Sequence, residues 1–209
     1  EPEEFSAWLS RMGVDETKVV VAYDALNAMF AARLWWMLKW LGHNNAAVLD
    51  GGFKRWLALG LPVTAELPRI IPASFKASVQ DTKVDSRYIE ERLHRPECVV
   101  IDARSPERFR GIGETLDPVG GHIPGARNHF FMNNLDEHGR FKSRDALRAS
   151  FGQSTGGAPP ENVVHQCGSG VTACHNLLAM ETAGLLGSKL YPGSWSEWCS
   201  EPSRPISRD

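Results

Sequence analysis

The chain has 209 residues, of which 42% are hydrophobic and 23% charged, so it can bury a sizeable core and is neither disordered nor fibrous. Its 23 basic and 25 acidic residues give a formal net charge of -2 without a Lys/Arg cluster, which argues against nucleic acid and anionic membranes as partners and favours small molecules. The longest apolar run, 34–38, is far shorter than the ~20 residues that span a bilayer, so we expect no transmembrane helix.

Four cysteines are too few for a disulfide scaffold, which favours a reducing compartment such as the cytoplasm. Residues 1–4 are acidic and no Met precedes them. We therefore expect no signal peptide in this stretch, and a natural beginning that lies upstream.

An internal repeat organises the chain. Each copy contains a β-branched strand, an amphipathic helix and a second strand with a glycine turn. These segments are 19–24, a helix to about 41 and 49–56 in the first copy, and 162–167, a helix to about 183 and 190–198 in the second. Gly51 and Gly193 lie 142 residues apart, whereas the strand ends Asp24 and Cys167 lie 143 apart, so the two loops differ by one residue.

This order of elements is typical of an α/β fold in which helices connect the strands of a parallel sheet. The second copy has additional upstream elements, namely a helix at 85–93 capped by Asp85 or Ser86, a strand at 98–102 and a loop at 121–126. Their counterparts in the first copy would precede residue 1, so we expect an N-terminally incomplete first domain. The predicted boundaries are a first domain at 1–62, a proline-containing linker at 63–83 and a complete second domain at 84–209.

The sharpest local signal is Cys167-Gly-Ser-Gly-Val-Thr172, which lies between a strand and a helix. Its two glycines let the backbone curl so that successive N–H groups point inward and form an anion cradle at the positive end of the helix. A cysteine there is expected to be a nucleophilic thiolate. The alternative is a buried structural cysteine in a tight turn, but the first copy carries Asp24 at this position, so the fold does not need the cysteine.

The remaining cysteines carry weaker signals. Cys98 and Cys174 are expected to lie in the core, and the role of Cys199 stays open. A zinc site built from His165, Cys167, Cys174 and His175 would lack a C-x-x-C pair, so we expect no metal and no cofactor.

A second signal is the strand end and helix start Asp102-Ala-Arg-Ser-Pro-Glu-Arg-Phe109, with Ser105 as the N-cap. Strand ends at the carboxyl edge of a parallel sheet face the ligand crevice, so Arg104, Arg108 and Arg110 are candidates to bind an anionic substrate group. The alternative is that these guanidinium groups are solvated or paired with neighbouring carboxylates.

Together these motifs resemble those of the rhodanese (sulfurtransferase) family. The segment 102–109 with Gly121-His-Ile-Pro-Gly-Ala126 resembles the upstream signature, and Tyr191-Pro-Gly-Ser-Trp-Ser-Glu-Trp198 resembles the C-terminal one. The resemblance covers essentially the whole chain. It implies two rhodanese-like domains, each a parallel sheet flanked by helices, as in two-domain thiosulfate and 3-mercaptopyruvate sulfurtransferases. In those enzymes the inactive first domain forms one wall of the active site of the second.

The resemblance also implies roles for individual residues. Cys167 would carry the sulfur, and an anion cradle would hold its charge. Arg108 would bind the substrate carboxylate. Ser169 would join a His and an Asp from the first domain. The full set implied for the site is catalytic Cys167 and Ser169, cradle residues Gly168, Ser169, Gly170, Val171 and Thr172, and substrate-binding Arg108, Arg104 and Arg110.

Two departures from the family pattern accompany this reading. A second substrate-binding arginine of the family would fall near Asp117, where this chain has none. The His and Asp partners of Ser169 would lie before residue 1.

The expected reaction moves a sulfane sulfur from 3-mercaptopyruvate, or thiosulfate, through a cysteine persulfide to a thiol such as thioredoxin or glutathione, or to cyanide. The neutral residues at 168 and 169 resemble the mercaptopyruvate type, because thiosulfate-type enzymes carry basic residues there. Three alternatives stay open: a thiosulfate-preferring enzyme, a non-catalytic sulfur-carrier module, and a phosphatase of the same fold. The last would need Cys-x5-Arg, but this chain has Ala173 at that position.

Overall fold

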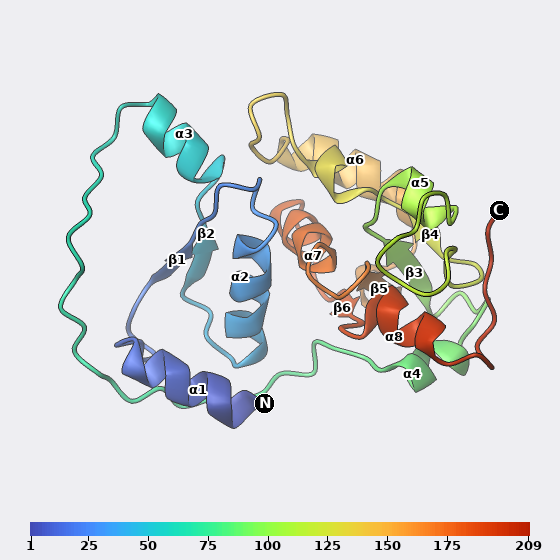
Figure 1. Ribbon diagram of the computed structural model, residues 1–209, viewed down its shortest axis with the longest axis horizontal. Coiled ribbons are helices and arrows are strands. Elements are labelled where there is room, and N and C mark those ends of the chain that lie inside the picture. Colours follow the sequence, from blue (N-terminus) through green and yellow to red (C-terminus); the bar gives the residue numbers. More distant parts are fainter. The chain divides into compact units, whose positions relative to one another are not determined.

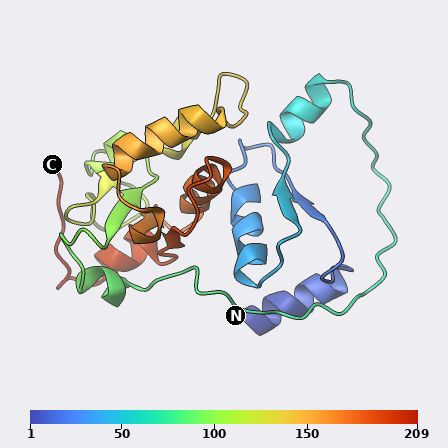
Figure 2. The ribbon, with the colours of Figure 1, turned by 180° about the vertical axis from the view of Figure 1, so that it is seen from behind.

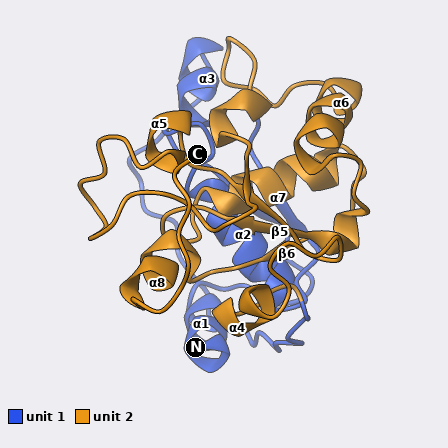
Figure 3. Cartoon of the chain, turned by 90° about the vertical axis from the view of Figure 1, so that its right-hand side faces the viewer, with its two compact units in different colours: residues 1–81 blue, residues 82–209 orange.

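Two parallel sheets form the framework of the computed structural model, which describes residues 1–209 (Figure 1). They belong to separate units, residues 1–81 and 82–209 (Figure 3). The boundary between the units lies inside the predicted linker 63–83, and no helix or strand is present between α3 and α4. No helix of the chain is both long enough and apolar enough to cross a membrane.

The second half of the predicted linker packs on unit 1. The amides of Ala73 and Ser78 donate to the carbonyls of Ser10 and Leu41, at 2.9 Å each. Phe75 is buried with Leu9 in the core of this unit. Residues 73–80 are therefore part of the first unit in the structure, not a free connection.

Unit 2 is built on a four-stranded, fully parallel sheet in the order β4-β3-β5-β6. Its strands are β3 (Val99–Asp102), β4 (Arg127–Asn128), β5 (Val163–Gln166) and β6 (Lys189–Leu190). Its helices are α4 (Ser86–Glu90), α5 (Pro106–Phe109), α6 (Arg144–Thr155), α7 (Ala173–Thr182) and α8 (Ser194–Ser200), with short 3-10 turns at Phe131–Asn134 and Pro160–Asn162.

Alternation along the strands of unit 2 sends side chains to two different cores. Ile101 and Val163 pack with residues of α6 and α7, whereas Val100 and Val164 pack with residues of α4 and α8. Both views of the ribbon show α6 and α7 on one side of this sheet and α4 and α8 on the other (Figures 1 and 2). The expected α/β fold of parallel sheets flanked by helices is confirmed.

Unit 1 contains α1 (Pro2–Arg11), β1 (Val20–Ala22), α2 (Ala31–Trp40), β2 (Ala46–Val48) and α3 (Gly52–Ala58). β1 pairs with β2 in parallel, and Leu9 of α1 packs with Leu38 of α2 in the core. The second strand of this unit ends at Val48, before the position predicted from the repeat.

The internal repeat is visible in the element boundaries themselves. The first residues of α2 and α7 are 142 positions apart, and the same spacing relates the starts of α3 and α8. It also relates the starts of α1 and α6, two helices that the sequence reading did not include. Unit 1 therefore corresponds to the part of unit 2 that runs from α6 to α8.

The two sheets differ in the number of strands that pair with the strand before the loop, β5 in unit 2 and β1 in unit 1. In unit 2, β5 lies between β3 and β6, and Val164 is 2% exposed. In unit 1, β1 pairs only with β2, and Val21 and Tyr23 are 52% and 60% exposed. One edge of β1 therefore has no strand partner within this chain.

Candidate active site

Cys167 follows the last residue of β5, and its backbone is fixed by the first turn of α8. Its N–H donates to the Oγ of Ser194 at 3.1 Å, and its carbonyl accepts from the N–H of Trp195 at 3.0 Å. The carbonyl of Gly168 accepts from the N–H of Ser196 at 2.9 Å. These three bonds hold the start of the loop against the helix, and the cysteine itself is 2% exposed.

The loop after Cys167 requires glycine at position 170. Gly170 has φ +75, a left-handed conformation that disfavours other residues, and a Cβ there would lie 2.6 Å from the carbonyl oxygen of Pro192. The thiol of Cys174 donates to the carbonyl of Gly170 at 3.3 Å. Ser169 is exposed at the loop, and Thr172 precedes the first residue of α7 as its N-cap. The sharp turn thus brings the loop back onto the N-terminus of α7.

The matching loop of unit 1 surrounds a carboxylate with backbone N–H groups. Asp24 stands where unit 2 has Cys167, and its carboxylate accepts four backbone N–H groups. The donors and distances are Leu26 at 2.8 Å, Ala28 at 3.0 Å, Phe30 at 2.9 Å and Ala31 at 2.9 Å. A strand end followed by a helix N-terminus is thus an anion site within this same chain, although the unit 1 loop is one residue longer.

Arg108 lies beside the cysteine loop. Its Nη1 would be 3.6 Å from a Cβ placed on Gly168. Its Nε and Nη2 face Glu114, with distances of 3.0 to 3.2 Å to the carboxylate, and Nη2 also lies 3.4 Å from Asp117. The two acidic groups hold the Nε and Nη2 edge of the guanidinium, and its Nη1 and Nη2 would lie 3.6 and 3.8 Å from a Cβ on Gly168.

The pKa of Glu114 is lowered even though partial burial works in the opposite direction. Backbone N–H groups and the Arg108 guanidinium stabilise its charged form. The carboxylate that orients Arg108 is therefore an anion at neutral pH.

Arg104 does not lie in a substrate-binding position, which corrects one sequence prediction. Its side chain is 1% exposed, and its Nη2 lies 2.7 Å from an Asp102 oxygen and 2.7 Å from the carbonyl of Gly121. The guanidinium also lies over the ring of Trp195. The alternative reading, an ion pair with a neighbouring carboxylate, describes this residue, because a buried charge requires such a partner.

Arg110 is exposed at the C-terminal end of α5, where its backbone N–H caps the helix. The structure thus brings Arg108 to the cysteine loop but gives no such placement to Arg110.

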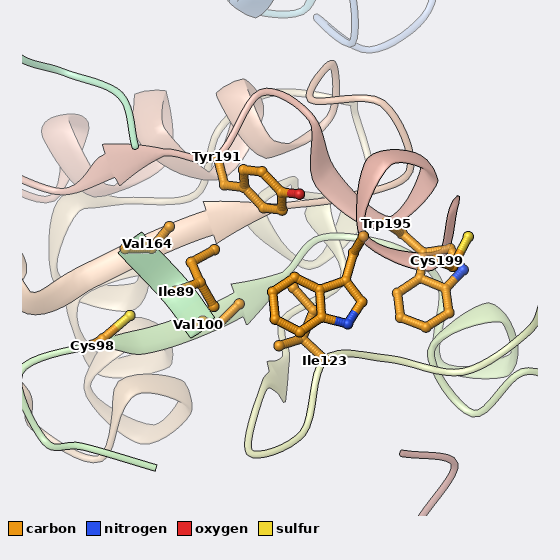
Figure 4. Packing of buried hydrophobic residues seen from close by; sticks show 9 residues of the cluster. Ile89, Cys98, Val100, Ile123, Val164, Tyr191, Trp195 and Cys199 are labelled. Carbon is orange, nitrogen blue, oxygen red and sulfur yellow. The ribbon is translucent and has the colours of Figure 1, made fainter. Parts of the chain in front are cut away.

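Cys98 and Cys199 lie away from the loop, and the pKa of each thiol is raised. All four thiols are free, and Cys98 and Cys199 lie at opposite ends of the core cluster between the sheet and α8 (Figure 4). Burial raises the pKa of Cys98 to about 11 and also raises the pKa of Cys199. Neither thiol is a ready nucleophile at neutral pH.

Sequence reasoning missed two contributors to this site. Glu114 is one of the neighbouring carboxylates expected to pair with an arginine, and in the structure it also orients Arg108. Ser194, the residue that binds the Cys167 amide, was passed over inside the Pro-Gly-Ser-Trp motif. The repeat offered a signal for it, because the matching residue of unit 1 is Gly52.

Comparisons with known proteins agree with this geometry. The family described as Rhodanese-like domain matches residues 1–59 and 85–201. The chain is 41% identical over 208 residues to a probable 3-mercaptopyruvate sulfurtransferase of Pseudomonas aeruginosa, covering 99% of this chain and 73% of that protein. It is 38% identical over 200 residues to a thiosulfate sulfurtransferase of Cricetulus griseus, covering 93% of this chain and 67% of that protein.

Among solved structures, a complex of an EanB variant with ergothioneine superimposes with a TM-score of 0.87 at 21% identity. The match covers 99% of this chain and 55% of that one, so the present chain spans about half of that protein's length. At this identity the likeness concerns the fold alone. The family match and the two relatives together establish that the chain belongs to the rhodanese family and is a sulfurtransferase of the 3-mercaptopyruvate and thiosulfate group.

Proposed function

We propose that the chain moves a sulfane sulfur from 3-mercaptopyruvate, through a persulfide on Cys167, to a thiol acceptor. One observation carries this proposal: Cys167 occupies the position at which unit 1 holds a carboxylate with four backbone N–H groups. A loop of this kind favours an anionic sulfur in both states of the cycle, first the thiolate and then the persulfide.

In the first step, the thiolate of Cys167 attacks the sulfur of 3-mercaptopyruvate. A sulfur–sulfur bond forms, the carbon–sulfur bond breaks, and its electron pair leaves with the carbon as the enolate of pyruvate. The proton that the mercapto group carried passes from the new persulfide to the enolate. The products are pyruvate and a Cys167 persulfide anion, and no external oxidant or reductant is needed.

In the second step, an acceptor nucleophile attacks the outer sulfur of the persulfide and the Cys167 thiolate leaves. A thiolate acceptor, such as that of reduced thioredoxin or glutathione, gives a new persulfide, and cyanide gives thiocyanate. The same N–H groups favour the departing thiolate, so the loop contributes to both halves of the reaction.

The charge around the loop supports 3-mercaptopyruvate over thiosulfate. Gly168 and Ser169 are neutral, and Arg108 is already paired with Glu114 and Asp117. One guanidinium beside the loop suits a single carboxylate, whereas a dianion would need more positive charge to offset its desolvation. The exposed hydroxyl of Ser169 is the proposed further contact to the donor. The thiosulfate-preferring alternative stays open because relatives of both names match.

The test compares wild type with Cys167→Ser, using Cys199→Ser as a matched control. After incubation with 3-mercaptopyruvate, intact-protein mass spectrometry should find one added sulfur in wild type and in the control, and none in Cys167→Ser. Persulfidation that survives in Cys167→Ser but disappears in Cys199→Ser would remove Cys167 from the mechanism. Rates measured in parallel with thiosulfate decide the donor, and a higher kcat/KM for thiosulfate would contradict the proposed preference.

A further inference from the structure

Ser194 adopts a backbone conformation that its residue type disfavours. Its φ is 55, in the left-handed region, and it is one of four residues other than glycine with a positive φ. The side chain is completely buried. At the matching position unit 1 has Gly52, with φ +59. Since the left-handed conformation costs a residue with a Cβ about 1 kcal/mol or more, the serine is expected to have a use that offsets this strain.

The hydroxyl of Ser194 connects the end of β6 to Cys167. Its Oγ accepts from the N–H of Cys167 at 3.1 Å and donates to the carbonyl of Tyr191 at 2.9 Å. Both bonds are buried. The hydroxyl therefore donates one hydrogen bond, to Tyr191, and accepts one, from Cys167. Together the two bonds fix the orientation of the Cys167 peptide relative to the sheet.

Unit 1 shows that the fold itself does not need this hydroxyl. The backbone bond from Trp195 to Cys167, at 3.0 Å, has a counterpart from Phe53 to Asp24 at 2.9 Å. Gly52 has no side chain with which to bind the Asp24 amide. Both units therefore form the same strand end and helix start. In unit 1, where the loop carries the carboxylate of Asp24, no hydroxyl is present. In unit 2, where the loop carries Cys167, the hydroxyl of Ser194 is present.

We propose that Ser194 is a positioning residue for Cys167: its Oγ fixes the amide of the cysteine so that the sulfur keeps the geometry needed for transfer. This inference rests on the proposed function, in which Cys167 accepts the sulfur. Ser194 does not contact the donor in this role, so its loss lowers the rate at saturating donor more than it changes KM.

The test compares Ser194→Gly with Ser194→Ala, using Ser200→Ala of the same helix as the control. Both Ser194 variants lack the Oγ, but only in the alanine variant does a Cβ make the left-handed conformation unfavourable. We expect the rate of Cys167 persulfide formation at saturating 3-mercaptopyruvate to fall about tenfold in both, with KM within about twofold of wild type. The urea midpoint should be higher for the glycine variant than for the alanine variant, and Ser200→Ala should keep the wild-type rate.

A role confined to stability predicts a different pattern, in which the rate follows the urea midpoint and Ser194→Gly reacts like wild type. That result would overturn the proposal, and so would a change in KM alone. Because Gly52 adopts the same φ in unit 1, the glycine variant is expected to fold even if the alanine variant does not. Wild type is measured alongside: if it forms no persulfide, the proposed function fails, whereas a wild-type persulfide with an unaffected Ser194→Gly rate refutes only the role of Ser194.

Discussion

Replacing Gly170 with alanine tests whether the turn after Cys167 depends on glycine. The left-handed conformation at φ +75 costs a residue with a Cβ about 1–2 kcal/mol. The added Cβ would also meet the Pro192 carbonyl at 2.6 Å, and an extra atom in a filled site typically costs a further ~1–3 kcal/mol. We therefore expect a loss of about 2–5 kcal/mol, which is a large part of the ~5–15 kcal/mol that stabilises a typical protein.

Gly168→Ala provides the matched control in the same loop. Gly168 has no positive φ, and a Cβ there would meet Arg108 Nη1 at 3.6 Å, an ordinary contact. Alanine at such a position should leave stability unchanged or raise it by about 0.4–1 kcal/mol.

Urea unfolding followed by tryptophan fluorescence measures both variants. With a slope of about 2 kcal/mol per M, the middle of the usual range, the midpoint of Gly170→Ala should fall by roughly 1–2.5 M relative to wild type and lie below that of Gly168→Ala. Persulfide formation should fall as well, because the loop must move away from Pro192. Equal midpoints for the two variants would refute the reasoning from backbone conformation and close contact.

The remaining predictions concern three other features. Arg108→Ala should raise KM for 3-mercaptopyruvate more than it slows discharge of the persulfide, because the carboxylate has left by the second step; unchanged donor kinetics would remove Arg108 from the site. Asp24→Ala should lower the free energy of unfolding by about 2 kcal/mol, because backbone N–H groups lose a charged acceptor, and a urea midpoint equal to that of wild type would contradict this. Burial lowers the pKa of His165 to about 3, so the unfolded chain, with an ordinary value near 6.5, binds the proton first and stability falls as pH drops from about 6.5 toward 3. Urea midpoints measured at several pH values should show a weaker acid dependence in His165→Leu, and an unchanged dependence would show that His165 is not responsible.

Local sequence signals predicted the elements of the fold that depend on neighbouring residues. Ser105 and Asp85 accept backbone N–H groups as N-caps in the structure, and the strand at 98–102 forms within one residue of its predicted start. The missed helices α1 and α6 also carry local signals. Pro2 begins the first, and the second runs from the cap of Ser143 to Gly156. Both helices lie N-terminal to the strands and glycine turns in which the repeat is evident from the sequence.

The parts of the site that could not be predicted depend on contacts between distant residues. Arg104 and Arg108 are four positions apart in one motif, yet one is buried against Asp102 and the other faces the cysteine loop. Which of them is sequestered depends on where Gly121 and Trp195 lie after folding. Sequence spacing carries no information about that choice, because both residues follow the same strand end.

The contacts that hold Cys167 also set the order in which the site can be completed during synthesis. The hydroxyl that binds the cysteine amide belongs to a residue 27 positions later in the chain, and two further bonds come from Trp195 and Ser196. While a ribosome is still making α7, the strand that carries the cysteine can already exist, but the groups that fix its loop cannot. A nascent chain therefore carries Cys167 before the groups that fix its loop have been made, and a chain that ends before Ser194 lacks the hydroxyl that binds the cysteine amide.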